Sequence, residues 1–229
     1  MPTPIRTLAL TALLLAVLAG CAAPATPDPD APPTLDEYLA QWDEYEPFEA
    51  SGSGNAVIDI PPGIASGMVT ATHRGSGVFR IFMANDIGQN FELLTRAGQY
   101  EGVVEWGLNI QADENRAVIT ADGGWTFRLE PLSNAPQIEL PLEGTTDAVY
   151  RYDGDSPAID DGILVVSEQQ GDIPSHFAFM QSYGSSDGIR RVELFVNGAA
   201  GTEDFIDLEP GPSIFVVVAS TPWRITADD

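Results

Sequence analysis

The 229-residue chain has one cysteine, two histidines and no lysine, so its ten basic residues are all arginines. A single cysteine excludes a disulfide within the chain, and stability must therefore come from packed cores. Two histidines without a second cysteine do not complete a common zinc ligand set unless carboxylates join them. The 34 acidic residues give a formal net charge of −24, which repels phosphate backbones, and we expect no nucleic-acid partner.

Long apolar runs are also scarce, and the run near the N-terminus, Leu8 to Ala19, has only twelve residues. This length is too short for a transmembrane helix, which needs about 20 residues. Arg6 precedes the run and small residues follow it, an arrangement typical of a secretory signal peptide. The sequence therefore predicts a cleaved signal rather than a membrane-spanning anchor.

The run ends in Leu18-Ala19-Gly20-Cys21, which resembles the lipobox of bacterial lipoproteins. The signal peptide of such proteins is cleaved before a cysteine that carries lipid. The resemblance implies a signal peptide over residues 1–20, acylation of Cys21 with chains such as palmitate, and a mature protein anchored to the bacterial cell membrane, facing outside the cytoplasm. Because a single acyl chain binds a bilayer only reversibly, stable anchoring requires two or three.

Residues 21–50 predict an acidic linker that contains one short helix. From Ala22 to Pro33 the chain consists of Ala, Pro, Thr and Asp only, which favours an extended, disordered tether. The sequence Thr34-Leu35-Asp36-Glu37 then matches a capping box and predicts a helix over residues 35–44. Its apolar residues recur at helical spacing, so one face packs either on the following domain or on a partner.

After Gly52 the sequence changes to short β-rich runs separated by Gly, Pro, Asn and Asp, at the spacing of an all-β sandwich. Seven runs are predicted as strands: Ala56–Ile60, Met68–His73, Val78–Met83, Phe91–Thr95, Val103–Leu108, Ala117–Ala121 and Trp125–Glu130.

The order of these runs recurs further along the chain. Phe79 and Phe177 are 98 residues apart, and so are Trp125 and Trp223. The run Gly67–Thr72 aligns with Gly162–Ser167, which places His73 opposite Glu168. The recurrence predicts two tandem, jelly-roll-like antiparallel β-sandwiches, repeat 1 over residues 51–132 and repeat 2 over residues 141–229, joined by a linker over residues 133–140. Because each repeat is small, we expect the two to pack on each other.

Repeat 1 carries a family resemblance, in Phe79–Ile81, Leu94–Gly102 and Ile119–Phe127. These segments resemble the small β-sandwich domains of actinobacterial surface lipoproteins, which are similar in layout to bacterial pre-peptidase C-terminal domains. The resemblance implies a jelly-roll-like sandwich with a non-catalytic accessory role. Repeat 2 departs from the pattern, since Asn197–Gly201 contains no tyrosine and Ser220-Thr221-Pro222 replaces the glycine turn before the tryptophan.

One motif suggests catalysis, because Gly184-Ser185-Ser186-Asp187-Gly188 fits G-x-S-x-G. A nucleophile elbow places this motif between a strand and a helix, with the catalytic histidine after it. Both His73 and His176 precede Ser186, and the flanking sequence is strand-like. We therefore predict a hairpin loop, with a serine hydrolase as the alternative.

An acidic stretch, Asp153 to Gly162, is the strongest candidate for a metal site. It offers Asp153, Asp155, Asp160 and Asp161 as oxygen ligands for calcium. Pro157 stands at the third ligand position of an EF-hand loop, however, and the bidentate glutamate is missing. We expect a solvated acidic loop and no cofactor, with weak calcium binding as the alternative.

The four tryptophans divide into two pairs. Trp125 and Trp223 occupy equivalent places in the repeats, which predicts core positions, with stacking on a sugar ring as the alternative. Trp42 and Trp106 have no repeat partner and are predicted as surface residues that contact a ligand.

These features favour a membrane-anchored extracytoplasmic lipoprotein that is not an enzyme and has a binding or structural role at the cell envelope, with an unknown protein or glycan as its partner. One alternative is an exported hydrolase. Another is an extracytoplasmic subunit of a membrane complex, docked through the helix predicted over residues 35–44.

Overall fold

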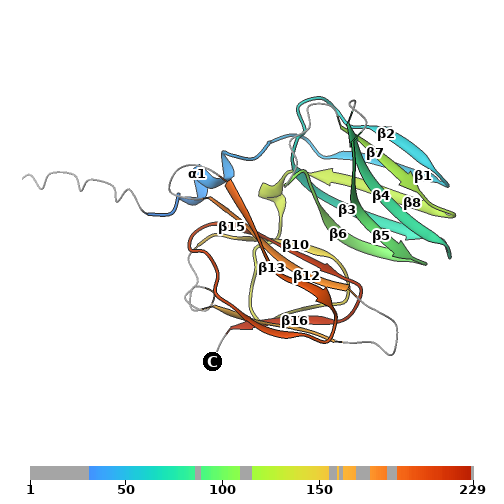
Figure 1. The fold of residues 1–229 in the computed structure, drawn as a ribbon. Helices are drawn as coiled ribbons and strands as arrows, with labels where there is room; N and C mark the ends of the chain where they lie inside the picture. Colours follow the sequence, from blue (N-terminus) through green and yellow to red (C-terminus); the bar gives the residue numbers. More distant parts are fainter. Residues whose placement is uncertain are drawn as a thin grey trace, which may run out of the picture.

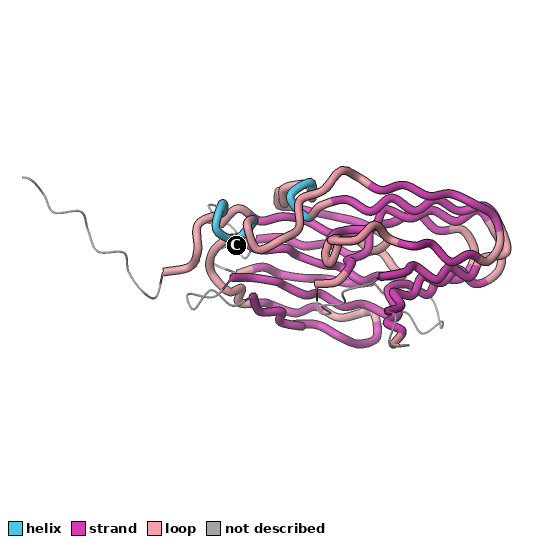
Figure 2. Tube along the Cα trace, turned by 90° about the horizontal axis from the view of Figure 1, so that it is seen from above, coloured by secondary structure: helices cyan, strands magenta, loops and turns pink. Residues whose placement is uncertain are grey.

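The computed structural model describes residues 31–85, 89–108, 115–154, 159, 162–168, 176–184 and 190–227. Regular structure in this part of the chain is β-strand apart from helix α1 (Leu35–Leu39), the 3₁₀ turn η1 (Leu132–Asn134) and the helical residue Ile159 (Figure 1). The predicted all-β fold is confirmed. Figure 2 shows the strands as the dominant element, with the two short helical segments near each other.

Repeat 1 is a sandwich of two antiparallel four-stranded sheets. Its strands are β1 (Phe48–Ser53), β2 (Ala56–Asp59), β3 (Gly67–Arg74), β4 (Val78–Asn85), β5 (Asn90–Ala97), β6 (Tyr100–Trp106), β7 (Asn115–Thr120) and β8 (Gly124–Glu130). One sheet has the order β1-β8-β3-β6 and the other β2-β7-β4-β5. Eight strands distributed in this way over two facing sheets form a jelly roll.

Repeat 2 has the same topology. Its strands are β9 (Leu142–Gly144), β10 (Ala148–Tyr152), β11 (Ile163–Ser167), β12 (His176–Gly184), β13 (Arg190–Ala199), β14 (Glu203–Ile206), β15 (Ser213–Ala219) and β16 (Trp223–Ala227). The sheets have the orders β9-β16-β11-β14 and β10-β15-β12-β13, which are those of repeat 1 with eight added to each strand number. The two sandwiches are therefore tandem copies of one fold.

Each repeat encloses its own apolar core, built by the alternation of the strands. In β4 the side chains of Phe79, Ile81 and Met83 are buried, while Val78 and Arg80 point outward. Phe177 and Phe179 are buried at the corresponding places in β12. Because successive side chains of a strand point to opposite faces, this pattern directs one row of each strand into the sandwich.

The helix of the N-terminal segment is shorter than predicted, and the first strand begins earlier. The capping box is present, since the Thr34 amide donates to Glu37 at 2.9 Å, but α1 ends at Leu39 rather than at residue 44. After Ala40 the chain turns so that Trp42 is buried, and tertiary packing overrides the helical pattern. Strand β1 begins at Phe48, within the segment predicted as linker.

A tryptophan packed on a glycine recurs in both repeats. Trp125 lies opposite Gly52 on the neighbouring strand and donates its indole N–H to the carbonyl of Gly54 at 2.8 Å. Trp223 lies opposite Gly144 and donates to the carbonyl of Thr146 at 2.9 Å. Both tryptophans are buried, so the prediction that they belong to the cores is confirmed.

The strand register corrects the alignment of the repeats by one residue. His73 pairs with Trp125, whereas the residue that pairs with Trp223 is Ser167. His73 therefore corresponds to Ser167, and the predicted match with Glu168 is wrong. A shift of one residue exchanges the two faces of a strand, which an alignment of similar apolar runs does not detect.

We expect Gly144→Ala to destabilise the protein by about 1–3 kcal/mol, because the added methyl group overlaps the Trp223 ring and forces it to move. The measurement is the free energy of unfolding from urea denaturation of the full chain. Gly198→Ala in β13 is the matched control, since an added Cβ meets no atom within 4 Å there. Equal stability of the two variants would contradict this role of the glycine.

Candidate functional site

The repeats are joined by a third apolar cluster, distinct from the two sandwich cores. Its buried members come from α1, both repeats and the segment between them: Tyr38, Trp42, Met68, Leu108, Leu132, Ala135, Val149, Ile214 and Val216. We call this set the joint. It places the outer face of the β10-β15-β12-β13 sheet against repeat 1, which confirms that the repeats pack on each other.

Strand β15 is buried on both faces at this contact. Phe215 and Val217 point into the core of repeat 2, while Ile214 and Val216 point into the joint. The uninterrupted apolar run from Ile214 to Ala219 is the sequence signal of such two-sided burial.

Trp42 and Trp106 are buried, contrary to the prediction that they lie at the surface. Trp42 is 5% exposed and packs edge-on against Tyr38 at a centroid distance of 5.8 Å, within the joint. Trp106 is fully buried and packs edge-on against Phe127 in the core of repeat 1. The predicted surface position is therefore wrong for both, because each fills an apolar interior. The apolar face of α1 likewise packs within the chain, and the Tyr38 hydroxyl donates to the carbonyl of Ser182 at 2.6 Å.

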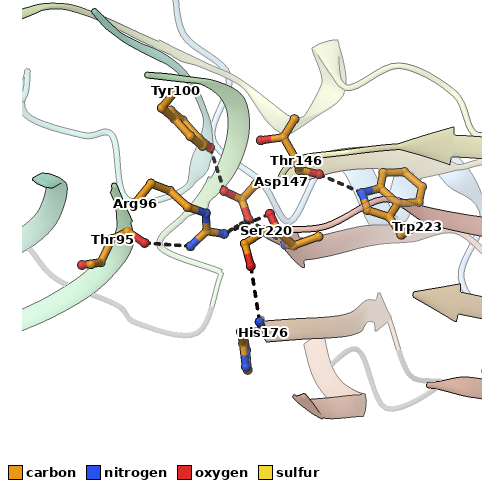
Figure 3. A network of polar contacts seen from close by, with 9 residues as sticks. Thr95, Arg96, Tyr100, Thr146, Asp147, His176, Ser220 and Trp223 are labelled. Carbon is orange, nitrogen blue, oxygen red and sulfur yellow. Dashed lines mark hydrogen bonds and ion pairs between the residues drawn. The ribbon is translucent and has the colours of Figure 1, made fainter. Parts of the chain in front are cut away.

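A buried polar network crosses the joint (Figure 3). Asp147 precedes β10, and its side chain is 1% exposed. From repeat 1, Arg96 forms an ion pair with this carboxylate, and the Tyr100 hydroxyl donates to it at 2.8 Å. From repeat 2, the Ala219 amide donates to it at 2.9 Å. The carboxylate is thus bonded by both repeats at once.

The electrostatics of this network depend on burial. Burial raises the pKa of the Asp147 carboxyl, and the opposing influences are the Arg96 charge and the hydrogen bonds from Tyr100 and Ala219. Burial and the nearby Asp147 charge raise the pKa of the Tyr100 hydroxyl, which stays protonated and able to donate. Because its acceptor positions are directed at protein donors, the carboxylate connects the two repeats rather than facing a ligand.

The acidic stretch predicted as a weak metal site is described only in part. The carboxylate of Asp153 accepts a hydrogen bond from Arg151 Nε at 2.7 Å. Asp155, Asp160 and Asp161 lie outside the described residues. Within the described ranges, no group of three or more His, Cys, Asp or Glu side chains is arranged to hold a metal ion.

The G-x-S-x-G motif follows a strand and precedes another. Gly184 is the last residue of β12 and lies opposite Arg190, the first residue of β13 in this antiparallel pair. Residues 185–189 lie outside the described chain. The flanking pair fits the predicted hairpin and not the strand-to-helix turn of a nucleophile elbow. His176 begins β12, eight residues or about 26 Å from Gly184 along an extended strand.

The other histidine is structural. His73 is 1% exposed, stacks on Phe79 at a centroid distance of 4.7 Å, and places Nδ1 2.7 Å from the carbonyl oxygen of Gly98. Its Nε2 lies 3.1 Å from a carboxylate oxygen of Asp122, whose pKa is lowered by the hydrogen bond from the Gly77 amide. His73 thereby fixes loops of repeat 1 to the end of β3.

The outer face of repeat 2 carries a groove of about 450 Å³ over β9, β16 and β11. Its lining combines charged, polar and apolar side chains: Glu143, Gly144, Thr145, Val166, Glu168, Pro222, Trp223 and Arg224. Repeat 1 has a groove of about 560 Å³ on the equivalent strands. The residues that line it are Glu49, Ala50, Ser51, Thr70, Thr126, Phe127 and Arg128.

The arginines of the two grooves differ in their partners. Arg128 forms ion pairs with Glu49 and Glu130. Arg224 is exposed, and no ion pair joins it to another residue of the described part of the chain. Its guanidinium can therefore donate to a ligand, while Glu143 and Glu168 offer acceptors beside the apolar Val166. The groove of repeat 2 is the candidate functional site.

Sequence reasoning missed both the polar network and the groove. Tyr100 and Asp147 are 47 residues apart, and Asp147 and Ala219 are 72 apart, so no local motif marks them. The groove residues come from β9, β11, β16 and the turns beside them, and only the observed register places Glu143, Arg224 and Val166 side by side.

No protein-family model matches the chain, and no curated protein shows significant similarity to it. Among solved structures, a turret protein of Sulfolobus turreted icosahedral virus is 14% identical over 79% of this chain and 95% of its own, with a TM-score of 0.25. A secreted protein of Parabacteroides distasonis is 10% identical over 86% and 96%, with a TM-score of 0.23. With scores this low, these similarities identify no function. No helix among the described residues has the length and apolar character needed to cross a membrane.

We expect Arg96→Met to destabilise the protein by about 3–5 kcal/mol, because it leaves the buried carboxylate of Asp147 without its counter-charge. The measurement is again urea denaturation, with Arg80→Met on an exposed position as the control. Adding Asp147→Asn to Arg96→Met should recover part of the loss, since the uncompensated charge is removed. A double variant no more stable than Arg96→Met would contradict this explanation.

Proposed function

We propose that the protein is a lipid-anchored extracytoplasmic lipoprotein that binds an uncharged glycan or a cationic peptide of the cell envelope without catalysing a reaction. The observation that carries the binding role is the groove of repeat 2, where the Arg224 guanidinium lies beside two glutamates and forms no ion pair with the described residues. The observation that supports the anchor is the sequence Leu18-Ala19-Gly20-Cys21 after its apolar run.

The chemistry of the groove favours a ligand with both donors and acceptors. Arg224 supplies N–H donors in a planar fork, and Glu143 and Glu168 supply acceptors. Val166 and Pro222 add apolar surface on which the carbon face of a sugar or an aliphatic side chain can pack. The net charge of −24 disfavours anionic ligands at long range and thus favours neutral or cationic ones.

The proposed anchor connects to the body of the protein at the joint. Ten residues, 22–31, separate Cys21 from Pro32 and Pro33, which lie close to Gly211 and Gly184 of repeat 2, and these ten can span about 33 Å when extended. Helix α1 then packs between the repeats (Figure 1). A tether of this length allows the groove of repeat 2 to reach envelope components near the membrane.

We expect Cys21→Ala to abolish incorporation of labelled palmitate and to move the protein from the membrane fraction to the soluble fraction. The measurement is radiolabelling followed by fractionation of bacterial cells that express the full chain. Thr26→Ala, in the same segment, should leave both readouts unchanged. Retention of label or of membrane association in the Cys21→Ala variant would refute the anchor.

We expect Arg224→Ala to weaken binding to purified bacterial cell wall by about ten- to a hundredfold, since a hydrogen bond to a charged group contributes roughly 1.5–3 kcal/mol. Binding is measured by co-sedimentation of the full chain carrying Cys21→Ser, with neutral polysaccharides and cationic peptides as soluble competitors. Arg74→Ala, on an exposed arginine of repeat 1, is the control. Identical binding by both variants would exclude this groove as the binding site.

A further inference from the structure

The joint uses one cross-strand row of repeat 2. On the β10-β15-β12-β13 sheet, Val149 and Met180 flank Val216 in register. Val149 and Val216 are each 2% exposed, and Met180 packs against the same cluster. Repeat 1 packs on this row.

Repeat 1 has the same row, and here it is partly exposed, since Phe82 and Val118 are half-buried. Val57 and Phe82 flank Val118 in the equivalent register of β2, β7 and β4. Val118 and Phe82 precede their counterparts Val216 and Met180 by 98 residues, the spacing of the two repeat tryptophans. Val57, the counterpart of Val149, is 63% exposed.

The other side of the joint is the β6 edge of repeat 1. The amide of Val103 donates to the carbonyl of Asp147 at 3.1 Å, and the Val103 side chain packs against the joint. The counterpart of β6 is β14. Val103 pairs with Thr70, which on its other side pairs with Arg128, the third residue after Trp125. Phe205 pairs with Leu164, which on its other side pairs with Thr226, the third residue after Trp223. Phe205 is therefore the counterpart of Val103. Phe205 is 51% exposed.

The charged pair of the joint is replaced by neutral groups on both open surfaces. Asn55 stands where repeat 2 has Asp147, since its side-chain oxygen accepts from the Ala121 amide at 3.1 Å as Asp147 accepts from Ala219. Gly198, which pairs with Phe177, stands where repeat 1 has Arg96, which pairs with Phe79. The Asp147–Arg96 pair thus has no charged counterpart on these surfaces, and the charges that share the face of the Val57–Val118–Phe82 row are those of Arg80 and of Arg116, which pairs with Asp59 across the strands.

We propose that the chain associates head to tail with further copies of itself, the Phe205 edge of repeat 2 packing on the Val57–Val118–Phe82 row of repeat 1 in the next copy. The contact repeats the one that already joins the repeats within the chain. Terminal units of repeat proteins normally present polar outer faces, whereas the outer surfaces here expose the apolar side chains of Val57 and Phe205. Because the two surfaces differ, the contact is heterologous and extends to a row or a ring of copies.

The test uses the full chain with Cys21→Ser, which removes the acylation site, in sedimentation velocity at physiological salt. The sedimentation coefficient of this parent should rise with protein concentration. Val57→Glu and Phe205→Glu should each hold it at the monomer value, because each places a charge in the contact. An equimolar mixture of the two variants should form pairs and nothing larger, since each retains the surface that the other has lost.

Leu194→Glu is the matched control. Leu194 is 47% exposed and pairs with Met180, at the place where repeat 1 already has Glu92 beside Phe82. This variant should associate like the parent, and unchanged circular dichroism should show that all variants are folded. A parent that stays monomeric at every concentration, a mixture that stays monomeric, or association lost in the Leu194→Glu control would each overturn the proposal.

Discussion

Two-sided burial of β15 is the constraint on which the rest of the structure depends. The strand has apolar side chains on both faces, so the sheet that contains it cannot leave its outer face in water. Repeat 1 and α1 cover this face, and the three parts of the chain consequently share the joint. Repeat 2 alone would lack this cover for β15, and repeat 1 alone would expose its own side of the joint.

The polar network restricts how the two repeats can be oriented at this apolar contact. A buried ion pair is weak evidence for stability, because desolvation of both charges offsets their attraction. Its geometric demand is strict, however, since Asp147 must meet Arg96, Tyr100 and the Ala219 amide together. The apolar cluster supplies the burial, and the network specifies one orientation of the two repeats.

Much of the fold could be predicted from local sequence, and the functional surfaces could not. Alternation in Phe79, Ile81 and Met83 marks a strand face, and the recurring tryptophans mark the duplication, because both are periodic features of the chain itself. The burial of Trp42 depends on surfaces from both repeats, so its lack of a repeat partner was misleading. The one-residue slip at His73 arose because apolar runs match equally well in either register, and only cross-strand pairing distinguishes them.

The position of α1 has a mechanical consequence for an anchored molecule. A pull on the segment before Thr34 would act first on the helix, whose Tyr38 side chain is held by the Ser182 carbonyl and by the ring of Trp42. The load would pass into the joint before it reached either sandwich core. With the lipid anchor proposed above, such a pull would act on the contact between the repeats rather than on one sandwich alone.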